Sequence, residues 1–206
     1  MTIQWGTTAR RFVLCVVMLG LLVVAAGCAA PQRFASQRVE PPAPLPAFQL
    51  VAEGNRPFQL SELKGHVVVV YVGYTHCPDI CPFTMSHLAA ARQQLPDVLK
   101  DDVKVVMITA DPARDTPELM SKYVHYFDPT FIGVSGSTDQ VLAALRQWGI
   151  SPECSTPNAD GGYTVSHPAT SYVLNRDGLL RLQMPHALEP EQIARDLKTV
   201  ANERTR

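Results

Sequence analysis

Apolar runs alternate with amphipathic segments along most of the chain. Residues 67–72 (VVVVYV) and 103–109 (VKVVMIT) are rich in β-branched and other apolar residues, as in strands buried on both faces of a sheet. Shorter runs with strand character occupy residues 48–52, 131–134, 170–174 and 179–184. Amphipathic segments predict helices at residues 83–95, 117–127, 137–148 and 189–202.

Local signals mark where these elements begin and turn. Thr116 followed by Pro117 is a good N-cap with proline at the first helical position, and Ser137 with Gln140 forms a capping box. Residues 175–178 (NRDG) predict the turn of a β-hairpin. Strands that alternate with helices and close with a hairpin and a helix predict a thioredoxin-like α/β fold, with a central mixed sheet flanked by helices.

The N-terminal part of the chain differs from this pattern. Arg10 and Arg11 precede residues 12–30, which contain no charged residue, as in an export signal. The sequence AAGC, which ends at Cys28, resembles a bacterial lipobox and predicts a lipid on this cysteine. An uncleaved segment that anchors the chain in the membrane is the alternative. In both cases the positive residues place the domain on the exported side, in the periplasm or at the cell exterior.

These features divide the chain into three parts. Residues 1–27 are the predicted signal peptide or membrane segment, residues 28–47 a lipidation site and extended proline-rich spacer, and residues 48–206 the thioredoxin-like domain. Charged residues make up 18% of the 206 residues, and the formal net charge is −1. Because no basic run or aromatic platform is present, we expect no nucleic-acid partner.

The five cysteines leave three in the predicted domain. Cys15 lies in the apolar segment and Cys28 is the predicted lipidation site, which leaves Cys77, Cys81 and Cys154. Three is an odd number, and too few for a disulfide scaffold in an oxidising compartment. Cys154 is then either a stray thiol or a resolving partner for the other two.

Cys77 and Cys81 follow directly after the predicted strand at residues 67–72. Pro82 suits the first turn of a helix, so both thiols lie near a helix N-terminus, whose partial positive charge favours thiolate. Their i, i+4 spacing places the sulfurs on one face with Cα atoms about 6 Å apart, which suits a disulfide or a soft metal ion. Because the C-x-x-x-C spacing differs from the C-x-x-C of thioredoxin, the redox use does not follow automatically. A structural disulfide or two buried core thiols are the plainest alternatives.

Cys77 and Cys81 lie in the stretch YTHCPDICPFT (74–84), and two further distinctive stretches are DPARDTPE (111–118) and GGYTVSHPATSYVLNRDG (161–178). All three resemble sequences of the Sco/SenC family of copper proteins. The resemblance implies a site for Cu(I), Cu(II) or both, in which His167 joins Cys77 and Cys81. His167 would lie in a loop that passes over the start of the cysteine helix. Ser166 and Pro168 depart from the residues that are commoner beside this histidine in the family.

Five other side chains near the predicted site have structural interpretations. His76 tunes the neighbouring thiolate or stays solvated, and Met85 packs in the core. Asp79 caps the helix or contacts the site without being a ligand. Asp111 and Arg114 form an ion pair that stabilises their loop.

Three functions are compatible with these residues. The resemblance implies a metallochaperone that delivers copper to the dinuclear copper site of cytochrome c oxidase, with the subunit that carries this site or another copper chaperone as partner. A thiol-disulfide oxidoreductase that keeps the oxidase cysteines reduced through Cys77 and Cys81 is the alternative on the same fold. A thiol peroxidase fits least, because no evident peroxide-binding arginine stands beside the thiols. His167 separates the first two, since a reductase does not need it.

Overall fold

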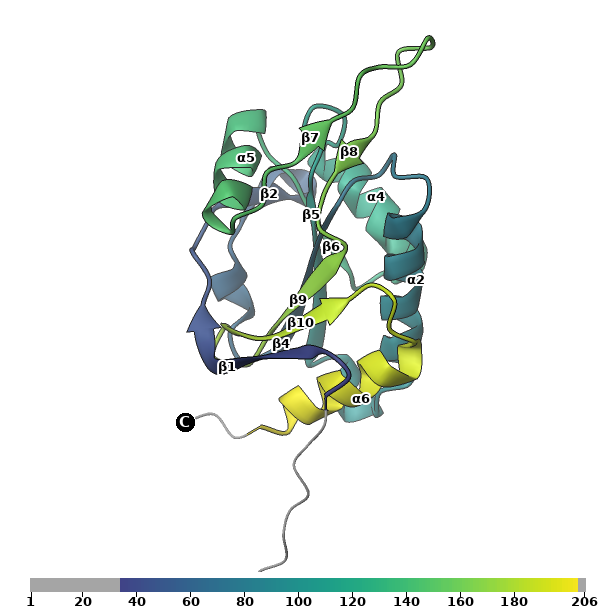
Figure 1. Ribbon diagram of the computed structural model, residues 1–206. Helices are drawn as coiled ribbons and strands as arrows, with labels where there is room; N and C mark the ends of the chain where they lie inside the picture. Colours follow the sequence, from purple (N-terminus) through teal and green to yellow (C-terminus); the bar gives the residue numbers. More distant parts are fainter. Residues whose placement is uncertain (1–33, 204–206) are drawn as a thin grey trace, which may run out of the picture. The chain divides into compact units, whose positions relative to one another are not determined.

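The computed structural model describes residues 34–203 (Figure 1). The predicted signal or membrane segment, the lipidation candidate Cys28 and the first part of the predicted spacer lie outside this range. Within the described range, no helix combines the length and the apolar character that crossing a membrane requires.

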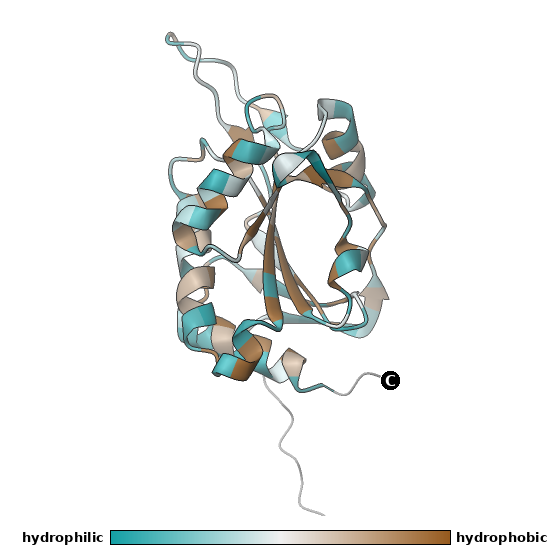
Figure 2. Cartoon of the chain, turned by 180° about the vertical axis from the view of Figure 1, so that it is seen from behind, coloured by the Kyte–Doolittle hydropathy of each residue, from teal (hydrophilic) through white to brown (hydrophobic). Residues whose placement is uncertain are grey.

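A mixed sheet forms the centre of the domain. Its six strands follow the order β1 (Gln37–Pro44), β10 (Leu179–Pro185), β9 (Thr170–Leu174), β4 (Val67–Gly73), β5 (Val103–Thr109) and β6 (Ile132–Val134). Strands β4, β5 and β6 are parallel, whereas β9, β10 and β1 pair antiparallel. Every residue of β4 is buried, as the apolar run predicted, and the strands at the centre of Figure 2 are correspondingly hydrophobic.

Helices cover both faces of this sheet. They are α2 (Ile80–Gln93), α3 (Asp97–Lys100), α4 (Pro117–Phe127), α5 (Thr138–Gln147) and α6 (Pro190–Ala201). In Figures 1 and 2, α2 and α4 lie on one side of the sheet and α5 on the other, and α2 packs against both α4 and α6. Two short ribbons and two 3₁₀ turns complete the domain: β2 (Leu50–Ala52) with β3 (Arg56–Phe58), β7 (Glu153–Cys154) with β8 (Val165–Ser166), η1 (Glu53–Asn55) and η2 (Leu60–Leu63).

The predicted helix starts are confirmed at α2, α4 and α5. The Thr116 side chain accepts a backbone N–H of α4, and Ser137 and Gln140 form the capping box of α5. Helix α2 begins at Ile80, so Pro82 lies in its first turn as predicted, and the amphipathic segment from residue 83 continues the helix. Cys81 therefore lies inside its first turn, followed by a proline whose missing N–H costs nothing at that position.

The structure differs from the predicted spacer at residues 37–44, which form strand β1. This strand pairs with β10 at the edge of the sheet, where prolines are tolerated because half of the N–H groups face away from the ladder. The buried carboxylate of Asp196 in α6 also accepts the N–H groups of Ala35 and Ser36, at 3.0 and 2.8 Å. The compact domain therefore starts at Phe34 rather than at Phe48.

Candidate metal centre

Cys77, Cys81 and His167 come from two segments that meet at one end of the central strands β4 and β9. After β4 ends at Gly73, the chain passes through Cys77 into the first turn of α2, which holds Cys81. His167 lies between β8 and β9, and β9 runs antiparallel beside β4. Because the start of β9 lies beside the end of β4, His167 meets Cys81 across 86 residues of sequence.

The three side chains have the spacing of metal ligands. One ligand atom from each, two Sγ and an imidazole nitrogen, all lie within 4.8 Å of one another. Cys81 Sγ is 3.4 Å from His167 Nε2. Sulfur and nitrogen atoms that share one ion through bonds of about 2.0–2.3 Å lie roughly 3.5–4 Å apart. An ion can therefore be held here after only small side-chain shifts.

Hydrogen bonding sets which nitrogen of His167 faces the sulfur. Nδ1 lies 3.1 Å from the carbonyl oxygen of Pro168, and because a carbonyl only accepts, Nδ1 carries the hydrogen. Burial lowers the pKa of His167 and so favours the neutral ring. Nε2 therefore directs a lone pair toward Cys81, which is the form in which imidazole binds a metal ion.

The two thiols of the cluster differ in accessibility. Cys81 has no exposed surface, and burial raises the pKa of its thiol to about 12. For Cys81 the expectation that the helix start favours thiolate is therefore wrong, because desolvation outweighs the partial charge of the helix. Cys77 is half-buried, and its Sγ accepts the backbone N–H of Cys81 at 3.4 Å. Both side chains are free thiols, so the pair offers one accessible and one buried sulfur to a metal ion or to disulfide exchange.

A buried carboxylate holds the loop that leads to Cys77. Asp115 has no exposed surface and accepts the backbone N–H of Thr75 at 3.1 Å, the Thr75 hydroxyl at 2.6 Å and the Thr109 hydroxyl at 2.7 Å. These bonds tie the loop after β4 to the end of β5. No local pattern marks Asp115 in the sequence, and its only signal is its place in the stretch 111–118 that resembles the family.

Replacing Asp115 with asparagine should lower the free energy of unfolding of the metal-free protein by about 1–3 kcal/mol. One carboxylate oxygen becomes an NH₂ group that faces a donor, so at least one hydroxyl or N–H of Thr75 or Thr109 loses its acceptor. Urea denaturation measures the change. Asp79→Asn is the matched control, with an expected change within about 0.5 kcal/mol, because the exposed Asp79 side chain does not cap the described backbone of α2. Equal losses in both variants would contradict this role of Asp115.

Three other predicted side chains lie outside the cluster of Cys77, Cys81 and His167. His76 is exposed, and its Nδ1 lies 3.0 Å from the Thr75 hydroxyl and 3.8 Å from the Asp115 carboxylate. Met85 is fully buried in the core, as expected. Asp79 stands at the N-cap position of α2, but its side chain does not form the capping hydrogen bond considered for it.

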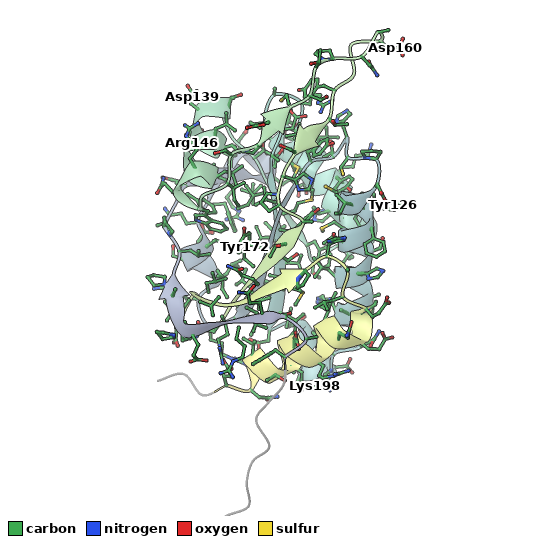
Figure 3. The ribbon with its side chains drawn as sticks, in the orientation of Figure 1. Tyr126, Asp139, Arg146, Asp160, Tyr172 and Lys198 are labelled. Atoms are coloured by element: carbon green, nitrogen blue, oxygen red, sulfur yellow. The ribbon has the colours of Figure 1, made fainter. Side chains whose placement is uncertain are left out.

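The predicted ion pair of Asp111 and Arg114 is confirmed, and it also fastens the segment between β7 and β8. The Tyr163 hydroxyl donates to Asp111 at 3.0 Å, and the Arg114 guanidinium lies 3.6 Å from the centre of the Tyr163 ring. Figure 3 shows Asp160 at the outer end of this loop, well away from the sheet. Cys154 is exposed on β7 and is not one of the three clustered side chains.

Comparison with known proteins agrees with this geometry. The model of the SCO1/SenC family matches residues 37–202. A protein of Stutzerimonas stutzeri that bears the name "Putative copper-binding protein" is 35% identical over 161 residues, which cover 78% of each chain.

Two solved structures show the same fold. Apo Sco1 from Thermus thermophilus is 32% identical with a TM-score of 0.74, covering 84% of this chain and 99% of its own. ScoI from Bradyrhizobium japonicum with copper bound is 33% identical with a TM-score of 0.67, covering 77% of this chain and 99% of its own. Together with the mixed sheet and its flanking helices, these similarities confirm the predicted thioredoxin-like fold.

Proposed function

Because the chain belongs to the SCO1/SenC family, we propose that Cys77, Cys81 and His167 bind one copper ion. The observation that carries this proposal is the convergence of two sulfurs and one imidazole nitrogen within 4.8 Å. Thiolates suit Cu(I), and the imidazole makes Cu(II) tolerable as well. A closed structural zinc site would need a fourth ligand, whereas the cluster found within residues 34–203 has three. The copper-bound relative from Bradyrhizobium japonicum supports the choice of metal.

In this proposal copper is a cargo, and its destination is the dinuclear copper site of cytochrome c oxidase. The acceptor is the oxidase subunit that carries this site, or another copper chaperone. Cys77 is the more accessible of the two sulfurs, so an acceptor ligand approaches the ion from that side. Buried Cys81 and half-buried His167 hold the ion until the acceptor has bound it.

A thiol-disulfide oxidoreductase is the second candidate, and the different burial of the two thiols favours it. Cys77 is half-buried beside the helix start, where it can attack a disulfide of the partner. Cys81 lies buried one turn along the chain, where it can resolve the mixed disulfide. In this role the pair reduces the copper-binding cysteines of the oxidase. Both functions require the reduced pair, because only thiolates ligate copper and only a thiolate attacks the disulfide of a partner.

The location of the domain is part of the same proposal. We place it outside the cytoplasm, in the periplasm or at the cell exterior, held at the membrane by a lipid on Cys28 or by an uncleaved segment. Support comes from the sequence alone: Arg10 and Arg11 precede the uncharged residues 12–30.

An anaerobic competition titration with a chromophoric Cu(I) chelator tests copper binding. The reduced protein should bind one equivalent, and protein oxidised to the Cys77–Cys81 disulfide should bind none. Cys154→Ser is the matched control and should bind like the wild type, because Cys154 is exposed and outside the cluster. If the reduced wild type does not compete for Cu(I), the copper proposal fails, and the reduction potential of the dithiol becomes the quantity to measure.

A further inference from the structure

Tyr71 contacts two of the three side chains of the proposed copper site. It lies in the central strand β4 without exposed surface, and its hydroxyl donates to Cys81 Sγ at 3.4 Å. Its ring meets the imidazole of His167 edge-on, with ring centroids 5.9 Å apart and an angle of 84° between the planes. One side chain of a buried strand thus borders both a sulfur and a nitrogen ligand.

A second tyrosine restricts the same imidazole. The ring of Tyr74 also meets His167 edge-on, with centroids 5.7 Å apart at 81°. Tyr74 is buried, and the Arg114 guanidinium lies 5.8 Å from the centre of its ring. Together with the hydrogen bond from His167 Nδ1 to the Pro168 carbonyl, these contacts leave the imidazole little freedom to turn. These contacts with the protein set the plane of the ring.

We propose that Tyr71 is a positioning residue of the copper site, whose hydroxyl withdraws charge from the Cys81 sulfur and whose ring holds the plane of His167. This inference rests on the copper binding proposed above. A hydrogen bond to a thiolate lowers the energy of the electrons that the sulfur donates, so that Cu(II) is stabilised less. Hydrogen bonds around cysteine sulfurs tune copper sites in this way. Tyr71 therefore shifts the preference of the site toward Cu(I).

Tyr123 offers a matched comparison for the hydroxyl of Tyr71. Its hydroxyl is also buried, but it has no hydrogen-bond partner among the described residues. Burial raises the pKa of Tyr123, and the nearby sulfurs of Cys81 and Cys77 add to the rise. Both tyrosine hydroxyls thus lie within electrostatic reach of the sulfurs, and only that of Tyr71 is hydrogen-bonded to one of them.

The first test uses the full-length chain loaded with Cu(II). Tyr71→Phe should move the sulfur-to-Cu(II) charge-transfer band to longer wavelength and lower the ratio of Cu(I) to Cu(II) affinity about tenfold. The copper stoichiometry should stay at one, and Tyr123→Phe should keep the wild-type band and ratio. An unchanged band in Tyr71→Phe, or an equal shift in Tyr123→Phe, would overturn the role of the hydroxyl.

A metal-free measurement separates this inference from copper binding itself. Nitrogen NMR of the His167 imidazole should show mainly the Nδ1–H tautomer in the wild type and in Tyr71→Phe, which keeps the ring. Tyr71→Leu removes the ring and should reduce the share of this tautomer, with circular dichroism to verify the fold. Wild-type tautomer populations in Tyr71→Leu would overturn the positioning role. A tautomer shift in a protein that does not bind copper would support that role and contradict the proposed function alone.

Discussion

Replacing His167 with alanine should abolish tight Cu(I) binding and leave thiol-disulfide exchange by Cys77 and Cys81 largely intact. The imidazole supplies one of the three clustered ligand atoms, and two thiolates alone hold the ion less tightly. We expect a loss of at least about 100-fold in Cu(I) affinity, because removing groups that merely orient a ligand already costs about 10–100-fold. Anaerobic chelator competition measures the affinity, and the rate of reaction with a small disulfide measures the exchange.

His76→Ala is the matched control for this variant. His76 adjoins Cys77 in the sequence but is exposed and outside the cluster, so its removal should change the Cu(I) affinity by less than about threefold, well below the cost of losing an orienting group. Equal affinities of the His167→Ala variant and the wild type would remove His167 from the site. Loss of disulfide exchange along with copper binding would show that His167 also serves the thiols, and the variant would then no longer separate the two candidate functions.

Replacing Gly73 with alanine should destabilise the fold and displace the site together. A Cβ atom at this position would lie 2.7 Å from Tyr71 Cε1, 2.8 Å from Cys81 Sγ and 3.0 Å from Met107 Cε. These neighbours are buried, and overpacking of this kind costs about 1–3 kcal/mol. Urea denaturation should show that loss. Chelator competition should show Cu(I) affinity at least about tenfold weaker, because the displaced sulfur is a ligand.

Gly136→Ala serves as the control for the glycine substitution. A Cβ atom there would meet its nearest neighbour, the Gln140 side-chain oxygen, at 3.4 Å, which is an ordinary contact. We expect its free energy of unfolding to stay within about 0.5 kcal/mol of the wild-type value, with unchanged copper affinity. Wild-type stability and affinity in the Gly73→Ala variant would contradict this prediction. They would show that the residues around the end of β4 move to make room for the added methyl group, and that neither folding nor copper binding requires the close approach of Cys81 to β4.

Much of the fold follows from signals that act over a few residues. The apolar runs at residues 67–72 and 103–109 form β4 and β5, and the capping box at Ser137 begins α5. Strand β1 is the exception, because its prolines indicate an extended spacer when the chain is considered segment by segment. Its place in the sheet depends on contacts such as the bond from Arg181 to the Val39 carbonyl, 142 residues apart. No local pattern contains that partner.

Within the site, too, a residue is harder to predict from the sequence when its partners lie far away along the chain. Cys77 and Cys81 stand out in the sequence because their spacing alone places them on one face of a helical turn. His167 was predicted from the resemblance, since a single loop histidine is otherwise unremarkable. No local signal distinguishes Tyr71 or Asp115, because a tyrosine in a buried strand and an acidic residue before a helix are both ordinary features.

By itself, the sequence determined the longer helices, the central strands and the pair of thiols at the start of a helix, because hydrophobic period, capping and i, i+4 geometry are local. The tertiary structure alone decided that His167 stands 3.4 Å from Cys81 and that the Tyr71 hydroxyl bonds to the same sulfur. Both contacts require β9 to lie antiparallel beside β4. That pairing is a property of the packed sheet, in which residues far apart along the chain become neighbours.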